Sequence, residues 1–295
     1  MGGLDILLVK PGSQKRLYGT LSDFALTGIE PPLWAALLAG WLRAQGYGVE
    51  ILDAEVSGLS TEQVASAVAA ARPRLAAVVV SGTNPSASTM NLTGAGRILS
   101  AVKRLAPWMP TLLAGLHPSA LPERSLREEA ADFVCQGEGF LTLGDLIEAL
   151  KNGADRFPIP GLWHWEGERV VSRPPPPLIG DLGTLPPPAW DLLPMEAYRA
   201  HNWHCFDEIT RRQPYAVIYT SLGCPFRCSF CCINALFGRR TIRYRPPEQV
   251  VAEIDFLVNR YGIRNIKIVD EMFALNERRV VDLCERIAER GYDLN

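Results

Sequence analysis

Short apolar runs alternate with amphipathic stretches over the first half of the chain. The runs are only a few residues long and contain few polar positions, which is typical of strands rather than helices. They lie at residues 4–9, 49–52, 75–80, 111–114 and 132–135. Strands that are apolar at nearly every position belong in a parallel sheet with both faces covered. The pattern therefore predicts a parallel sheet in this part of the chain.

Amphipathic segments separate these runs and predict the helices that cover the sheet. Pro31 and Pro32 open the first helix, because proline is favoured in a first turn, and Gly46 ends it. Further helices are expected at residues 61–72, 93–105, 123–131 and 140–150. The alternation indicates an α/β domain over residues 1–151, a doubly wound parallel sheet of the flavodoxin or Rossmann type.

A sheet of this type binds its ligand beyond the carboxyl ends of the strands. The loops expected there are residues 11–19, 81–86, 115–119 and 136–139, which are rich in Gly, Ser, Thr or Asn. No Gly-x-Gly-x-x-Gly motif follows the first strand, which weakens a dinucleotide-binding interpretation. A CheY-like sheet with no ligand remains an alternative, because fold alone does not give function.

Residues 152–213 have a different composition. Trp163-His164-Trp165 and the residues that follow suggest a small hairpin, and proline runs then stiffen an extended connector, in which we expect Trp190 to pack onto a domain. From residue 214 the strand and helix pattern resumes. Strands at 216–220 and 265–269, each followed by a helix, predict the start of a (β/α) barrel over residues 214–295.

Three cysteines, Cys224, Cys228 and Cys231, stand three and two residues apart after the first strand of this second part. Three thiolates on one short loop can hold three irons of a [4Fe–4S] cube, whereas electron-transfer clusters use four cysteines. The fourth iron is then free for a substrate or cofactor. A zinc site is the alternative, but structural zinc usually takes two pairs of ligands. Cys232 is expected to pack away from the cluster.

The Cys-x3-Cys-x2-Cys spacing, with Phe230 before the last cysteine, resembles the radical S-adenosylmethionine (SAM) superfamily. The resemblance implies that the open iron chelates SAM and that one electron cleaves it to a 5′-deoxyadenosyl radical. It also implies a cluster loop at the carboxyl end of the first strand of a TIM-like barrel, the edge that carries active sites in that fold. An acidic motif after the second strand contacts SAM in the family, and Asp270 and Glu271 match it loosely.

The first domain resembles the cobalamin (B12)-binding domain fused to many radical SAM enzymes. The resemblance is carried by residues 31–33, 49–54, 115–119, 121–123, 132–134 and 137–139. It implies that the loops after strands three, four and five embrace the corrin. The implied cofactor neighbours are Ser81, Gly82, Thr83, Asn84, Gly115, His117, Gly137, Glu138 and Gly139. The Asp-x-His-x-x-Gly loop of classical methyl-transfer domains is absent, so the resemblance is compatible with cobalamin without a protein lower ligand. His117 is a candidate cobalt ligand, although a histidine before proline in a turn more often caps a backbone group or packs against neighbouring side chains.

Composition and charge narrow the class of protein. The 295 residues are 47% hydrophobic and 21% charged, with a net charge of −2. This balance describes an ordinary globular protein with no electrostatic footprint for nucleic acid, and no apolar run is long enough to cross a bilayer. Seven cysteines, an odd number, fit a reducing cytoplasm. Arg239, Arg240, Arg243 and Arg245 are expected either to neutralise a carboxylate or phosphate or to form a solvated face.

The resemblance implies a cobalamin-dependent radical SAM enzyme, in the first place a methyltransferase that methylates an unactivated carbon of a small molecule. A reductant such as flavodoxin or ferredoxin would be its partner. The alternatives are a cyclase or rearrangement enzyme with the same cofactors, a non-catalytic cobalamin-binding module, and a methylthiotransferase. Only two β/α units follow residue 214, so we expect a fragment that is inactive alone and exposes the edge of its strand at 265–269.

Overall fold

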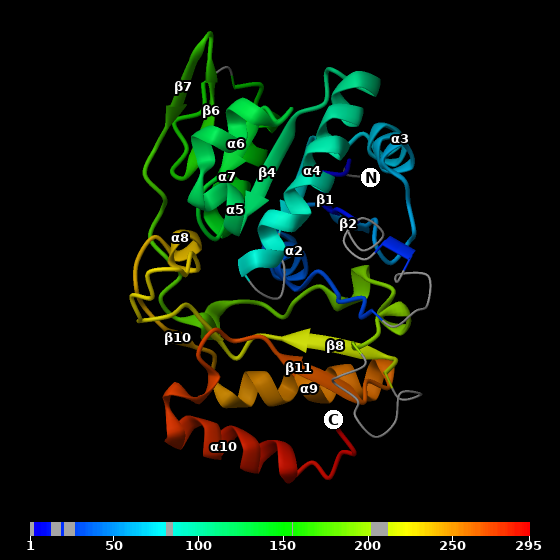
Figure 1. Ribbon diagram of the computed structural model, residues 1–295, viewed down its shortest axis with the longest axis vertical. Helices are drawn as coiled ribbons and strands as arrows, with labels where there is room; N and C mark the ends of the chain where they lie inside the picture. The colour runs from blue at the N-terminus through cyan, green and yellow to red at the C-terminus, as the bar shows by residue number, and fades with distance from the viewer. Residues whose placement is uncertain (1–2, 13–18, 21–26, 81–84, 155, 202–211) are drawn as a thin grey trace.

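The computed structural model describes residues 3–12, 19–20, 27–80, 85–154, 156–201 and 212–295. Two units lie one above the other (Figure 1). The upper unit is a seven-stranded sheet in the order β2-β1-β3-β4-β5-β6-β7, in which the first five strands are parallel and β6 and β7 are antiparallel additions. The strands are β1 Ile6–Lys10, β2 Val49–Asp53, β3 Leu75–Val80, β4 Thr111–Gly115, β5 Phe133–Cys135, β6 Leu162–Glu166 and β7 Arg169–Ser172.

Helices cover both faces of this sheet, as expected for a doubly wound fold. They are α2 Leu33–Ala44, α3 Thr61–Ala71, α4 Pro85–Leu105, α5 Leu116–Ala120, α6 Pro122–Glu128 and α7 Phe140–Lys151. Alternate residues of β1 enter two separate cores: Leu7 and Val9 pack with residues of α3 and α4, while Ile6 and Leu8 pack with residues of α2 and α7. Burial on both faces is why the strand segments contain so few polar positions.

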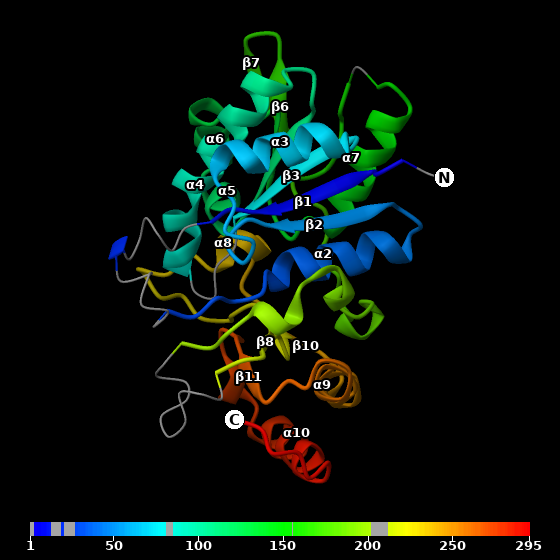
Figure 2. The same ribbon diagram turned by 90° about the vertical axis from the view of Figure 1, so that its right-hand side faces the viewer.

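The second core continues into the lower unit. Trp34 of α2 contacts Tyr219 edge to face, with ring centroids 6.1 Å apart, and Trp190 of the connector is 1% exposed. Figure 2 shows α2 between the sheet and the lower unit. The two units therefore share one continuous apolar core, and the expectation that Trp190 packs onto a domain is confirmed.

The lower unit holds two parallel strands backed by two helices. Strand β8 (Tyr215–Ile218) pairs with β11 (Asn265–Ile268), and α9 (Pro247–Tyr261) and α10 (Glu277–Ala288) follow them in turn. A short antiparallel ladder, β9 (Ser221–Leu222) with β10 (Arg243–Tyr244), and the single-turn helix α8 (Asn234–Phe237) lie between β8 and α9 in the sequence. This is the expected order of two β/α units. Asn295 N donates to Arg264 O and Ile266 N donates to Asn295 O, so the other edge of β11 is partly paired.

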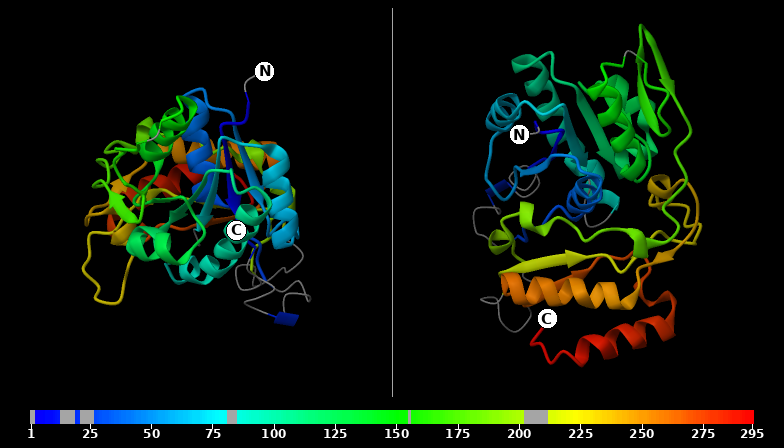
Figure 3. Two further views of the ribbon diagram at one scale, coloured as in Figure 1. Left: turned by 90° about the horizontal axis from the view of Figure 1, so that it is seen from above. Right: turned by 180° about the vertical axis from the view of Figure 1, so that it is seen from behind.

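The connector begins at the edge of the upper sheet and then passes between α2 and the lower unit (Figure 2), where Trp190, Met195 and Tyr198 are buried. Its hairpin, β6 with β7, extends the upper sheet beside β5. The chain then runs down past α8 to the lower unit, as the right-hand view of Figure 3 shows. Its described residues include the short 3-10 turns Leu182–Thr184, Trp190–Leu192 and Met195–Ala197, and another such turn, Phe273–Leu275, precedes α10. No helix in the described ranges is long and apolar enough to cross a membrane.

Three predictions differ from the structure by three residues or more. Helix α4 begins at Pro85 rather than residue 93, α6 ends at Glu128 rather than residue 131, and residues 116–120 form the short helix α5 instead of a loop. The first part of α4 contains Ser, Thr and Asn, which have low helix propensity. Packing decides its conformation: Ser88 is buried, and its hydroxyl donates to Val80 O at 2.8 Å.

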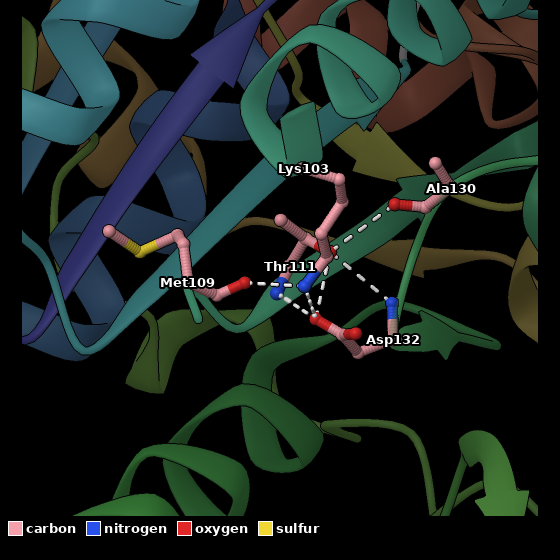
Figure 4. A network of polar contacts seen from close by, with 5 residues as sticks. All are labelled: Lys103, Met109, Thr111, Ala130 and Asp132. Carbon is pink, nitrogen blue, oxygen red and sulfur yellow. Dashed lines mark hydrogen bonds and ion pairs between the residues drawn. The ribbon is translucent and has the colours of Figure 1, made fainter. Parts of the chain in front are cut away.

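A polar network fixes the amino end of β4, at the edge of the sheet away from the lower unit (Figure 4). Asp132 accepts hydrogen bonds from the backbone nitrogen and hydroxyl of Thr111 at 2.7 and 2.9 Å and from Lys103 Nζ at 2.5 Å. Lys103 Nζ also donates to Met109 O at 2.6 Å. Because the ligand edge of such a sheet is the carboxyl edge, this network serves stability.

Candidate functional site

The three motif cysteines share one loop that leaves the carboxyl end of β8 through β9. Cys224 is buried, and Cys228 and Cys231 are exposed. Cys231 N donates to Cys228 O at 3.1 Å, which closes a turn between the last two thiols. Over the described ranges no three His, Cys, Asp or Glu side chains converge on one point as metal ligands. The donor chemistry nevertheless fits an iron–sulfur cluster, since three soft thiols lie within eight residues.

The remaining described cysteines do not extend this ligand set. Cys135 is fully buried in the upper unit, where burial raises the pKa of its thiol to about 12. Cys284 lies on α10 and is exposed. Cys232 is exposed as well, so the expectation that its side chain packs against the protein was wrong. A single-turn helix begins at Asn234, directly after the cysteine loop, and leaves this side chain in solvent.

The start of the cysteine loop is held tightly by its neighbours. Gly223 has φ +95°, and a Cβ there would lie 2.3 Å from Thr241 O, so only glycine fits. Asp270 accepts hydrogen bonds from Thr220 N at 2.6 Å and from Ser221 Oγ at 2.7 Å. Its carboxylate therefore holds the junction between β8 and β9 together. The sequence did not predict this structural role.

Glu271 lies on the other side of the same junction. It accepts a hydrogen bond from Gly223 N at 3.3 Å, one residue before Cys224. Burial raises the pKa of its carboxyl to about 7, with a smaller contribution from the negative charge of Asp270. Phe230 of the same loop is 91% exposed. Of the three residues expected to contact SAM, Glu271 is therefore the one whose carboxyl group bonds directly to the start of the cysteine loop.

Two of the four arginines after the loop do not face solvent or a free anion. Arg243 and Arg245 are 7% and 8% exposed, and each pairs with a buried carboxylate. Arg243 pairs with Glu138 of the upper unit, and Arg245 Nη1 lies 2.5 Å from Glu253 Oε2 on α9. Of the two alternatives for these residues, a solvated face was wrong, whereas each does neutralise a carboxylate, that of Glu138 for Arg243 and that of Glu253 for Arg245.

The carboxyl edge of the upper sheet brings the loops after β4 and β5 together. Ser119 Oγ donates to Gly115 O at 2.7 Å, and Gly137 N donates to Ser119 Oγ at 3.0 Å. His117 is half-buried, and its Nδ1 lies 3.1 Å from Thr89 Oγ1. Burial lowers the pKa of its imidazole, so the ring is neutral near pH 7. Ser81, Gly82, Thr83 and Asn84, which were expected at this edge, lie outside the described residues.

Gly115 is the residue of this edge with the strictest steric requirement. It has φ +127°, and a Cβ would lie 2.0 Å from Val80 O on the neighbouring strand. We expect Gly115→Ala to destabilise the upper unit by about 3 kcal/mol or more, because left-handed strain and a backbone clash add together. Urea unfolding measures this. The control is Gly144→Ala on α7, where the nearest atom is 3.6 Å away, and an equal loss in both variants would contradict the prediction.

The carboxyl edge of the upper sheet faces the segment that follows the cysteines. Helix α8 packs against α5, and Arg243 of the lower unit pairs with Glu138 of the loop after β5. A cavity of about 260 Å³ lies at this contact, lined by residues 136–141, 175–179 and 235–239. The structure thus brings together residues from 137–139 and from the end of the cysteine loop, which are about 100 positions apart in sequence.

Comparison with known proteins assigns both units. Residues 24–147 match the B12 binding domain family, and residues 218–294 match the radical SAM superfamily. The chain joins a B12-binding domain to a radical SAM domain. The predicted fold class and the predicted resemblance to both families are confirmed.

Relatives share this arrangement. The chain is 33% identical over 99% of its length to an uncharacterized methyltransferase of Pyrococcus horikoshii, of which it covers 59%. It is 30% identical over 90% of its length to the anaerobic magnesium-protoporphyrin IX monomethyl ester cyclase of Rubrivivax gelatinosus, of which it covers 46%. The chain therefore spans about half the length of these relatives.

Solved structures show the same fold. The radical SAM methyltransferase TsrM of Kitasatospora setae, solved with a tryptophan substrate and a SAM analogue, superposes with a TM-score of 0.71 at 23% identity. That alignment covers 98% of this chain and 51% of TsrM. The cobalamin-dependent SAM radical enzyme OxsB, with aqua-cobalamin and SAM bound, gives a TM-score of 0.70 at 21% identity, with 99% of this chain and 38% of OxsB covered.

Proposed function

We propose that the protein of which this chain forms the B12-binding and first radical SAM part is a cobalamin-dependent radical SAM methyltransferase. The observation that carries the proposal is the union of the two domain types in one chain, with the cysteine loop and the ligand edge of the sheet joined through α8 and Arg243. When bound, a [4Fe–4S] cluster supplies the electron that cleaves SAM, and cobalamin carries the methyl group. The protein positions these groups.

Cys224, Cys228 and Cys231 are the proposed cluster ligands, and Phe230, Asp270 and Glu271 are the proposed neighbours of SAM. The carboxylate of Asp270 already accepts hydrogen bonds from Thr220 and Ser221. Asp270 would therefore support the SAM site indirectly, by holding these two residues in place. The proposed cobalamin neighbours are the loop residues Gly115, His117, Gly137, Glu138 and Gly139, with residues 81–84. The proposed setting is the cytoplasm, with a small-molecule substrate and a flavodoxin or ferredoxin as the reductant.

Anaerobic reconstitution with iron, sulfide and hydroxocobalamin tests the assignment. We expect one [4Fe–4S] cluster and one cobalamin per chain, and an EPR signal of the reduced cluster that changes when SAM is added. Tetrahedral zinc at the three thiols, or no uptake of cobalamin, would overturn the proposal.

A cyclase is the second candidate function, because the chain is 30% identical over 90% of its length to the R. gelatinosus cyclase. Both activities use the same cofactors, so cofactor content does not separate them. Product analysis of the full-length protein does: a methylated product supports the methyltransferase, and a new ring without added carbon supports the cyclase.

Glu271 gives the proposal a pH dependence. The amino group of SAM presents N–H donors, for which an ionised carboxylate is a stronger acceptor than a protonated one. Since the pKa of Glu271 is raised to about 7, SAM affinity should rise with pH through that value and binding should release a proton below it. Calorimetry of the reconstituted chain between pH 6 and 8, in buffers of different ionisation enthalpy, measures both. Glu271→Gln should bind more weakly and lose the part of the pH dependence that is centred near 7, and an unchanged profile would contradict the prediction.

A further inference from the structure

Glu138 and Arg243 form a buried ion pair between the two domains. Arg243 Nη2 donates to Glu138 Oε1 at 2.5 Å, and Nη1 donates to Oε2 at 3.1 Å. Both side chains are 6% exposed. This bidentate contact fixes the distance between the two groups and also their relative orientation, because each of the two terminal guanidinium nitrogens must bond to one carboxylate oxygen.

On the upper side, Glu138 belongs to the loop after β5 and has little freedom. Gly137 and Gly139 on either side of it have φ +102° and +88°. Gly137 N donates to Ser119 Oγ at 3.0 Å, and Trp34 Nε1 donates to Glu138 O at 3.2 Å. The position of the carboxylate is therefore tied to the ligand edge of the sheet.

On the lower side, Arg243 is linked to the start of the cysteine loop. It pairs with Leu222 across the β9–β10 ladder, two residues before Cys224. Its guanidinium also donates to Ile179 O at 2.8 Å and lies 5.5 Å from the ring centroid of Phe237 on α8. A displacement of Arg243 would move β10, which pairs with β9, and the nearby Thr241 against which Gly223 is packed.

We infer that Glu138 and Arg243 are positioning residues that set where the cysteine loop sits relative to the ligand edge of the B12-binding domain. The inference rests on the proposed function for the cofactors bound at the cysteine loop and at the ligand edge. The coupling between these two segments, by contrast, depends on residues of this chain alone. Two apolar side chains of similar size would hold the interface together as well, because a buried ion pair loses much of its attraction to desolvation. What the ion pair adds is a fixed distance and orientation between the loop after β5 and β10.

Hydrogen exchange of the chain, monitored by mass spectrometry without cofactors, tests the coupling. Glu138→Gln should raise exchange in residues 221–232, in the other domain, as well as around its own loop. Asp132→Asn is the matched control, since it alters a carboxylate with several bonds at the opposite edge of the same domain. It should raise exchange only near β4. Unchanged exchange of residues 221–232 in Glu138→Gln would overturn the inference.

A spectroscopic measurement separates positioning from simple stabilisation. In the reconstituted protein, pulsed EPR reports the distribution of distances between Co(II) and the reduced cluster. We expect one narrow distribution in the wild type and a broader one in the double variant Glu138→Met/Arg243→Met, which should fold as well as the wild type. Equal widths would overturn the inference. If the wild type takes up neither cofactor, the proposed function fails, while the exchange result still decides whether the domains are coupled.

Discussion

Cys228→Ala should abolish uptake of the [4Fe–4S] cluster and cleavage of SAM. Cys228 is exposed on the loop, and Cys231 N donates to its carbonyl, so removal of the thiol changes the ligand set without opening a core. Loss of a direct ligand should lower the affinity for the cluster by more than the roughly 10- to 100-fold that is typical of altering a residue hydrogen-bonded to a ligand. Iron and sulfide content, the charge-transfer absorption and the yield of 5′-deoxyadenosine measure the loss.

The adjacent cysteine supplies a matched control for this prediction. Cys232 is also exposed and lies on the same loop, but it falls outside the Cys-x3-Cys-x2-Cys spacing. Cys232→Ala should therefore retain full cluster content. A Cys228→Ala protein that still binds the cluster and cleaves SAM, or a Cys232→Ala protein that loses it, would show that the ligand set has been assigned to the wrong thiols.

Arg245→Met should strongly destabilise the radical SAM domain. Arg245 and Glu253 are 8% and 6% exposed, and Trp190 Nε1 also donates to Glu253 at 2.9 Å. Removing the guanidinium leaves a buried carboxylate without its counter-charge, which costs about 3–5 kcal/mol. It also removes the hydrogen bond from Arg245 Nη1 to Tyr219 O. Urea unfolding of the chain measures the change.

Two further variants test whether the loss of stability in Arg245→Met comes from the unpaired buried carboxylate. Arg245→Met combined with Glu253→Leu should recover most of the stability, since no charge then remains buried. Arg286→Met removes one partner of an ion pair on α10 whose side chains are about half exposed, and it should cost less than about 1 kcal/mol. A loss in Arg245→Met no larger than in Arg286→Met would mean that the buried pair contributes no more than a surface pair.

The elements that sequence reasoning placed well are those with strong local signals. The five parallel strands could be found because each is apolar at nearly every position, a consequence of burial on both faces. The cysteine loop could be found from spacing alone. The start of α4 could not, because Ser88 and its neighbours have weak helix propensity and are held by contacts with β3.

The sequence by itself determined the alternation of strands and helices, the three thiols on one loop and the glycines at the ligand edge, since each depends on residues close together in the chain. Only the tertiary structure showed that Arg243 meets Glu138 across 105 positions and that Asp270 is bound by Thr220 across 50. The physical reason is that the charge of a side chain is written in the sequence, whereas its partner depends on how distant segments pack. The same arginine can face water, a ligand or a buried carboxylate, and packing of the two domains selects the last.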